Sequence, residues 1–160
     1  MEKVLISACL LGQNVRYDGN NLGLDSLSFQ RLSELVEFVA ICPEVSGGLS
    51  TPRTPAEIVQ GAGIDVIEQR AQVITQTGAN VTDAFVVGAQ NALALCKKNN
   101  IRAAVLTDAS PSCGSSKIYN GEFAGEKIAG HGVTTALLRE NGITVFSQFE
   151  LENAIEFVNR

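Results

Sequence analysis

The sequence lacks most of the short motifs that mark common enzyme and binding families. No C-x-x-C pair occurs among its cysteines, which leaves no zinc-finger or thioredoxin pattern. No Walker loop, no G-x-S-x-G motif and no G-x-G-x-x-G after the first apolar run is found. The strongest sequence markers of nucleotide-binding proteins and serine hydrolases are therefore absent.

Charge is also scarce, above all positive charge. Only 18 % of the residues are charged, and 12 Lys and Arg face 17 Asp and Glu, which gives a net charge of −5 at pH 7. No basic patch with interleaved aromatic residues is present, and binding to a nucleic-acid backbone needs clustered Lys and Arg. We therefore expect no nucleic-acid partner.

Long apolar runs are missing as well. None approaches the roughly 18 residues that a membrane-spanning helix requires. The opening MEKVLISACLLG is brief, no small-residue cleavage site follows it, and Gln13, Asn14 and Arg16 come at once, so it reads as a buried strand rather than a signal peptide. These features predict a cytoplasmic protein without a membrane partner, in which thiols stay reduced.

Short apolar runs alternate with helical patterns along the chain. The length of 160 residues fits one domain, and a hydrophobic content of 45 % permits a single core. Expected strands are Val4–Ala8, Phe38–Ile41, Ala103–Leu106 and Ile143–Phe146, with two short extended pieces at Ile64–Ile67 and Gln72–Thr75. Expected helices are Ser28–Glu37, a long helix from Asn80 or Thr82 to Lys98, Gly132–Glu140 and Glu150–Val158.

This alternation predicts the fold class. Short strands that are apolar throughout are typical of a mostly parallel sheet that is covered on both faces. We expect a three-layer α/β/α domain of the doubly wound, Rossmann-like type, with residues 1–160 forming one domain.

Three of the four cysteines follow expected strands. Cys9 comes directly after Val4–Ala8, Cys42 directly after Phe38–Ile41, and Cys113 a few residues after Ala103–Leu106. The carboxyl ends of parallel strands meet at one edge of a sheet, where ligands bind, so the three thiols are expected to converge. Cys96 differs because it lies on the apolar stripe of the long helix, which indicates a core position.

Converging thiols have several possible roles. Cysteine thiolates hold zinc and iron–sulfur clusters, and a four-iron cluster held by three cysteines leaves one iron free to act as a Lewis acid. His131, the only histidine, can complete a Cys3His zinc site instead. Ordinary half-buried cysteines are the third possibility.

Other residues near these cysteines are candidates for chemistry or binding. Glu44 lies two residues after Cys42 and can serve as a general base, while Ser110 and Ser112 precede Cys113 and can donate hydrogen bonds to substrate or to metal-bound sulfur. If the protein holds no metal, the alternative is a small-anion site. The helix start in GHGV, which contains His131, would then offer its free N–H groups to the anion. Arg16 and Arg53 are further candidates, because each lies in a loop that can reach the same edge, and a position at the surface is the alternative for both.

Four blocks of the sequence together resemble one known family. The blocks CLLGQNVRYDG, CPEVSGGLSTPRTPAEI, SPSCGSSKIYNGEF and GHGVTTALL span nearly the whole chain in order, and the chain is similar to the bacterial 2-thiouracil desulfidases. The resemblance implies a [4Fe-4S] cluster held by Cys9, Cys42 and Cys113, with one open iron. It also implies catalytic roles for Glu44 and for a serine, Ser110 first and Ser112 second.

The implied reaction is a hydrolysis without electron transfer. A small thiocarbonyl substrate such as 2-thiouracil gives uracil and hydrosulfide, with Glu44 taking a proton from the attacking water and Ser110 stabilising charge or passing a proton. The resemblance leaves a monomer or a homodimer open. A structural zinc-binding domain or a small-anion-binding α/β domain without catalysis remains the alternative.

Overall fold

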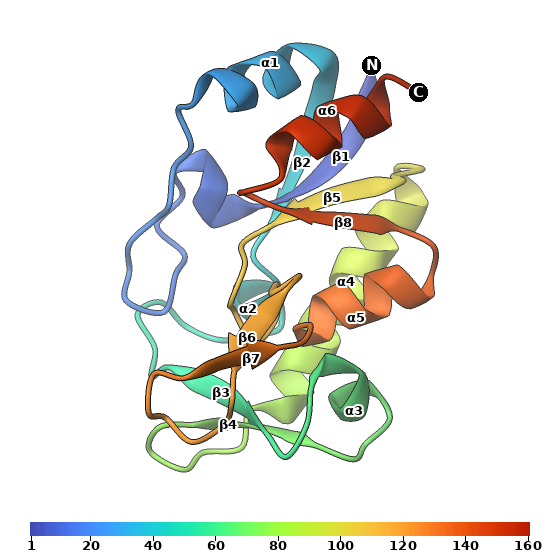
Figure 1. Ribbon diagram of the computed structural model, residues 1–160. Coiled ribbons are helices and arrows are strands. Elements are labelled where there is room, and N and C mark those ends of the chain that lie inside the picture. The colour runs from blue at the N-terminus through green and yellow to red at the C-terminus, as the bar shows by residue number, and fades with distance from the viewer.

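Four parallel strands form the central sheet of the protein. The structure is a computed structural model that describes residues 1–160. The sheet has the order β2-β1-β5-β8, with β1 at Glu2–Ser7, β2 at Val36–Ile41, β5 at Ala103–Leu106 and β8 at Thr144–Ser147 (Figure 1). The predicted α/β class, with a parallel sheet in a single domain, is confirmed.

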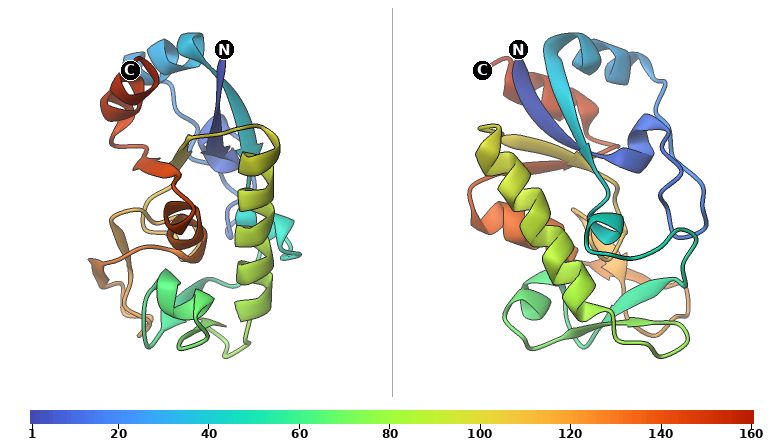
Figure 2. Two further views of the ribbon diagram at one scale, coloured as in Figure 1. Left: turned by 90° about the vertical axis from the view of Figure 1, so that its right-hand side faces the viewer. Right: turned by 180° about the vertical axis from the view of Figure 1, so that it is seen from behind.

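Helices cover both faces of this sheet, which explains why its strands are apolar throughout. Val4 and Ile6 of β1 pack toward α1 (Leu27–Leu35) and α6 (Leu151–Val158). Leu5 packs toward α4 (Thr82–Lys98) and α5 (Val133–Glu140), because successive side chains of a strand point to opposite faces. Figure 2 shows α4 and α6 on opposite sides of the sheet.

The order of the strands creates a natural binding position. The chain goes from β1 to β2 on one side and later returns to β5 on the other side of β1. In open parallel sheets, ligands bind outside the carboxyl ends of the strands at such a reversal. The short 3-10 helix η1 (Ala8–Leu11) follows β1 there, and α2 (Pro43–Ser46) follows β2.

A small lobe lies beyond the carboxyl ends of the sheet, in the lower half of Figure 1. It contains the antiparallel pairs β3–β4 and β6–β7 together with α3, and its apolar core rests on the first half of α4. Its elements are β3 (Ala56–Val59), α3 (Gly63–Ile67), β4 (Gln72–Thr75), β6 (Lys117–Tyr119) and β7 (Lys127–Ala129).

The small lobe is where the sequence predictions were partly wrong. Ile64–Ile67, expected to be extended, is inside the helix α3, whose start is stabilised because Asp65 Oδ2 accepts a hydrogen bond of 2.8 Å from Ala62 N. The predicted strand Gln72–Thr75 is confirmed, but its partner is Ala56–Val59, for which the sequence predicted no strand. Elements of three to five residues are too short to show a clear periodicity.

The helices that pack on the sheet agree with the predictions to within a few residues. α4 begins where Asn80 Oδ1 accepts a hydrogen bond of 3.0 Å from Thr82 N, and Cys96 on its buried face packs among apolar side chains. Burial raises the pKa of the Cys96 thiol to about 11, as expected for a core residue. None of the helices combines the length and the apolar character needed to cross a membrane.

Candidate functional site

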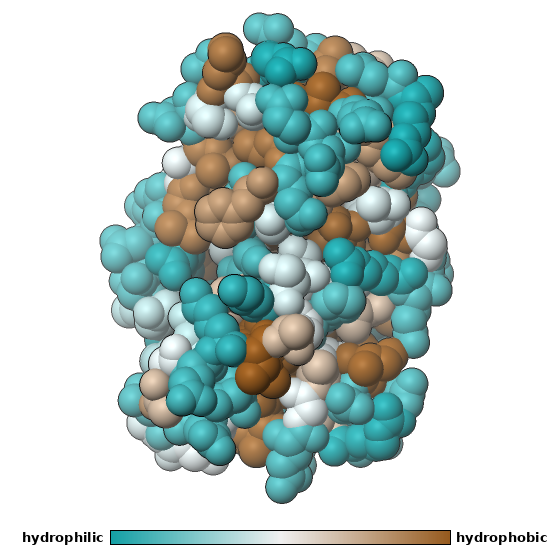
Figure 3. Space-filling view, in the orientation of Figure 1, coloured by the Kyte–Doolittle hydropathy of each residue, from teal (hydrophilic) through white to brown (hydrophobic).

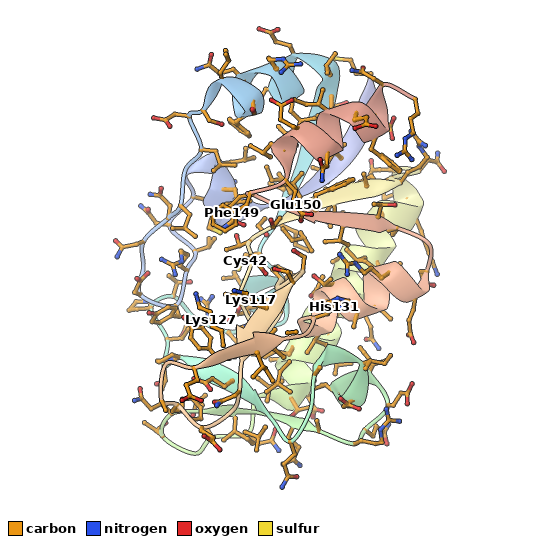
Figure 4. All side chains as sticks on the ribbon, viewed as in Figure 1. Cys42, Lys117, Lys127, His131, Phe149 and Glu150 are labelled. Atoms are coloured by element: carbon orange, nitrogen blue, oxygen red, sulfur yellow. The ribbon has the colours of Figure 1, made fainter.

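A cavity of about 680 Å³ opens at the carboxyl ends of the strands, between the sheet and the small lobe. Every residue predicted for catalysis or cofactor binding lines it: Cys9, Cys42, Glu44, Ser110, Ser112 and Cys113. Figure 4 places Cys42 near the middle of the molecule, with Lys117 and Lys127 below it and Phe149 above it. The predicted convergence of the three strand ends is therefore present in the structure.

The three cysteines reach the cavity from three separate elements. Cys9 lies in η1 after β1, Cys42 is the residue before α2, and Cys113 lies in the turn after β5. Cys9 and Cys113 are buried and Cys42 is half-buried, and all three are free of disulfide bonds. Cys9 Sγ lies 2.9 Å from Thr107 Oγ1, which ties the end of β1 to the end of β5.

Burial disfavours the thiolate form of these three cysteines. Desolvation raises the pKa of Cys9 and of Cys42, and it raises the pKa of Cys113 to about 12. Negative charge on Cys42 would raise the pKa of Cys9 and Cys113 further, which shows that the three groups act on one another. A bound cation such as iron favours the thiolate form and offsets this effect of burial.

The arrangement fits a cluster better than a single ion. No three His, Cys, Asp or Glu side chains are grouped closely enough to hold one metal ion. In an iron–sulfur cluster each cysteine binds a different iron. The ligand sulfurs therefore lie farther from one another than the ligands of a single metal ion do. Three free thiols that line one cavity from three separate elements match that requirement.

His131 does not belong to this group. Its Nε2 lies 2.8 Å from Arg139 Nη1, and it is not among the residues that line the cavity. Figure 4 also shows His131 well away from Cys42. The alternative prediction of a Cys3His zinc site is therefore wrong, because the loop before α5 directs His131 toward Arg139 of α5 and away from the three cysteines.

The alternative of an anion cradle at the GHGV helix start is also wrong. Val133 N donates to Pro111 O and Thr134 N donates to Ser112 O, each at 2.8 Å, so these N–H groups are already bonded. A Cβ at Gly132 would come within 2.5 Å of the Ser112 carbonyl carbon, which explains the glycine. The start of α5 thus holds the turn that carries Cys113.

Glu44 is fixed through both of its carboxylate oxygens. Arg53 Nε donates to Oε1 at 3.1 Å, while Oε2 accepts from Ser112 Oγ at 3.1 Å and from Ser110 Oγ at 3.4 Å. The side chains of Arg53 and Glu44 are only 8 % and 15 % exposed. The predicted neighbours are therefore in contact, in a setting with little water.

The two serines differ in what else they bind. Ser110 Oγ accepts hydrogen bonds of 3.1 Å from both Ser112 N and Cys113 N, and it lies 2.9 Å from Ser112 Oγ. Accepting two N–H groups polarises the Ser110 hydroxyl and makes it the better proton donor. Ser112 Oγ instead approaches Cys113 Sγ, at 3.5 Å.

Asp108 organises the turn that carries Cys113, and sequence reasoning missed it. Its Oδ1 accepts N–H bonds of 2.8 to 3.3 Å from four residues, and its Oδ2 accepts from Ser116 Oγ at 2.5 Å; the N–H donors are Ala109, Ser115, Ser116 and Lys117. Burial alone would raise its pKa, but these bonds lower the pKa to about 2. The available signal was an Asp between a strand end and a serine-rich loop.

Replacing Asp108 with Asn should destabilise the fold by about 1–2 kcal/mol at pH 7, after allowance for solvent screening of a partly exposed group. Because the folded-state pKa lies below the ordinary value of 3.8, the stabilisation is present above about pH 4 and is lost as the pH falls toward 2. Urea unfolding of wild type and variant across this range measures it. The exposed Asp25→Asn is the control, and equal stability of Asp108→Asn and wild type at pH 7 would contradict the prediction.

The rest of the cavity wall is partly basic and partly aromatic. Lys117, Tyr119, Arg16 and Arg53 line it, whereas Asn120, the residue after Tyr119, does not. Lys127, Gln148 and Phe149 also line the cavity. The sequence did not predict them, because nothing near them in the sequence links them to the cysteines. The additional lining residues are Arg16, Tyr17, Lys117, Tyr119, Lys127, Gln148 and Phe149.

Comparisons with known proteins agree with this site. Residues 4–150 match the family described as 2-thiouracil desulfurase. The chain is 43 % identical over 152 residues to an uncharacterized protein, YbbK, of Bacillus subtilis (strain 168), covering 95 % of this chain and 99 % of that protein. A solved structure of TudS, a [4Fe-4S]-dependent thiouracil desulfidase, is 48 % identical with a TM-score of 0.86 and covers 98 % of this chain and 99 % of that one. The resemblance noted in the sequence is confirmed.

Proposed function

This chain belongs to the 2-thiouracil desulfurase family, and we propose that it removes sulfur from 2-thiouracil or a similar small thiocarbonyl compound with the help of a [4Fe-4S] cluster. The observation that carries the proposal is the meeting of Cys9, Cys42 and Cys113 in one cavity beside Glu44. The solved relative with 48 % identity is itself described as a [4Fe-4S]-dependent thiouracil desulfidase.

Cys9, Cys42 and Cys113 would hold the cluster through their thiolates. When bound, such a cluster supplies an iron without a protein ligand, a Lewis acid that polarises a thiocarbonyl group. Thr107 and Ser112 offer hydroxyl groups next to Cys9 Sγ and Cys113 Sγ, at 2.9 and 3.5 Å. Hydrogen bonds of this kind orient metal ligands and tune the metal.

Glu44 is the general base of the proposed reaction. Arg53 pairs with its Oε1, and Oε2, which also accepts hydrogen bonds from the two serines, takes a proton from a water that attacks the thiocarbonyl carbon. Ser110 and Ser112 surround the same oxygen, so they can return the proton to the departing sulfur. The balance is thiouracil plus water giving uracil, hydrosulfide and one proton that is released to solvent, with no electron gained or lost.

The surroundings of the site suit a small substrate. A cavity of about 680 Å³ can hold a small heterocycle together with a cofactor. We further propose that residues 1–160 act as one domain, as a monomer or homodimer, in the cytoplasm. With a net charge of −5, no nucleic-acid backbone is proposed as a partner.

The direct test is conversion of 2-thiouracil by protein purified without oxygen. Uracil is followed by chromatography and hydrosulfide by a colorimetric assay, and the two should appear in equal amounts without an added reductant. Protein with a full cluster that forms neither product would remove 2-thiouracil as a substrate. A requirement for reductant would contradict the hydrolytic reaction.

Arg53→Met should lower kcat about ten- to a hundredfold, since a hydrogen bond to a charged group is worth about 1.5–3 kcal/mol. Arg53 donates to Glu44 Oε1 and also to Val15 O at 3.0 Å, so it joins the segment after Cys9 to the segment after Cys42. Steady-state kinetics with parallel iron analysis measures the effect. The matched control is Arg70→Met, an exposed arginine on the small lobe, and unchanged kcat in Arg53→Met would show that Glu44 needs no such support.

A further inference from the structure

Phe149 is the most exposed large apolar side chain of the protein, yet it lines the cavity. The residue is 80 % exposed and belongs to the turn between β8 and α6. Figure 4 shows it above Cys42 at the upper rim of the site, and in the same view Figure 3 shows apolar surface at that place. Aromatic side chains that line a cavity are the usual apolar contacts of a bound small molecule, and this ring is placed where such a ligand can cover it.

The exposure is imposed by a well-bonded turn. Phe149 N donates to Ser147 Oγ at 3.1 Å, Ser147 N donates to Glu150 Oε1 at 2.9 Å, and Glu150 N donates to Ser147 O at 3.1 Å. These three bonds fix the backbone on both sides of Phe149. The ring therefore has only its own two side-chain torsions to adjust, so ordering it over a ligand costs little entropy.

The turn is also tied to the turn that carries Cys113. Gln148 Oε1 accepts a hydrogen bond of 2.9 Å from Asp108 N, and Asp108 in turn binds the backbone as far as Lys117. The position of the Phe149 ring is thus set relative to the cysteine end of the cavity. Gln148 itself lines the same wall of the cavity.

We propose that Phe149 is a substrate-binding residue whose ring stacks on the face of the planar heterocycle that carries the thiocarbonyl group. This inference rests on the proposed function and adds to it a preference for flat, conjugated thiocarbonyl compounds over acyclic ones such as thiourea. Aromatic side chains prefer stacked contacts with other π systems, and stacking of a base on an aromatic residue is worth about 1–3 kcal/mol by alanine substitution.

The test compares three variants at Phe149. Phe149→Ala should raise KM for 2-thiouracil about tenfold, the middle of the range expected for loss of base stacking, with kcat and iron content unchanged. Phe149→Tyr should stay within about twofold of wild type, and Phe149→Leu should resemble the alanine variant because it is apolar without a π face. The control is Leu27→Ala, a residue that is 72 % exposed and does not line the cavity.

Calorimetric binding of the product uracil gives a readout that does not depend on turnover. The dissociation constant should rise about tenfold in Phe149→Ala and Phe149→Leu but not in Phe149→Tyr. Unchanged KM and uracil affinity in Phe149→Ala would overturn the inference, as would a leucine variant equal to wild type. Wild-type protein that binds uracil but converts no 2-thiouracil would refute the proposed reaction and leave the binding test of Phe149 valid.

Discussion

Replacing Cys9 with Ser should abolish retention of iron and, with it, all conversion of 2-thiouracil. Cys9 is one of three thiols that face the cavity, and the other two cannot hold a four-iron cluster in place because two of its irons would then lack protein ligands. A serine hydroxyl in the same buried position does not ionise at neutral pH. Iron and acid-labile sulfide analysis of anaerobically purified protein measures the loss.

Cys96→Ala provides the matched control for this result. Cys96 is also buried, but it lies on the buried face of α4 in the apolar core and does not line the cavity. Its removal should cost some stability and leave iron and activity at wild-type levels. Full iron content in Cys9→Ser, or loss of iron in Cys96→Ala, would mean that the cluster is held elsewhere.

Glu44→Gln should retain iron but lose activity about 10²- to 10⁴-fold, the range typical of a lost general base. The amide has nearly the shape of the carboxylate and can keep one contact with Arg53 or the serines, yet it cannot accept a proton from water. Oε2, the oxygen that takes the proton in the proposed reaction, lies beside Ser110 and Ser112. Because this role belongs to the chemical step and not to substrate binding, the loss should appear in kcat rather than in KM. Steady-state kinetics on variant with wild-type iron content separates the two.

Glu37→Gln is the control for the change of charge. Glu37 is exposed on β2, at the outer strand of the sheet, so its replacement should alter neither kcat nor iron content. A Glu44→Gln variant with wild-type kcat would remove Glu44 from the chemistry. Water activation would then have to come from another group in the cavity.

The fold of the larger part of the protein could be predicted because its strands are buried on both faces. Runs such as Val4–Ala8 and Ala103–Leu106 have no polar alternation, and that pattern fits a covered parallel sheet. Once the sheet is parallel, Cys9 and Cys42 must end at the same edge. Geometry common to all such sheets, rather than any local motif, thus brought the candidate ligands together.

The fold of the small lobe and the contacts of His131 and Asp108 around the site could not be predicted in the same way. The three-residue strands β6 and β7 carry too few side chains to show alternation, and the fold of this lobe depends on tertiary packing around Phe85. The direction of His131 depends on its contact with Arg139, and the role of Asp108 depends on four backbone N–H groups that converge only after folding. Such contacts leave no periodic signal in the sequence.

The central claim is that Cys9, Cys42 and Cys113 together hold one four-iron cluster. Analysis of iron, acid-labile sulfide and zinc in protein purified without oxygen tests it most directly. The account predicts a brown protein with four irons and four sulfides per chain, as in the [4Fe-4S] cluster named for its relative, and no zinc. A colourless protein that carries one zinc per chain, or no metal after reconstitution with iron and sulfide, would contradict it.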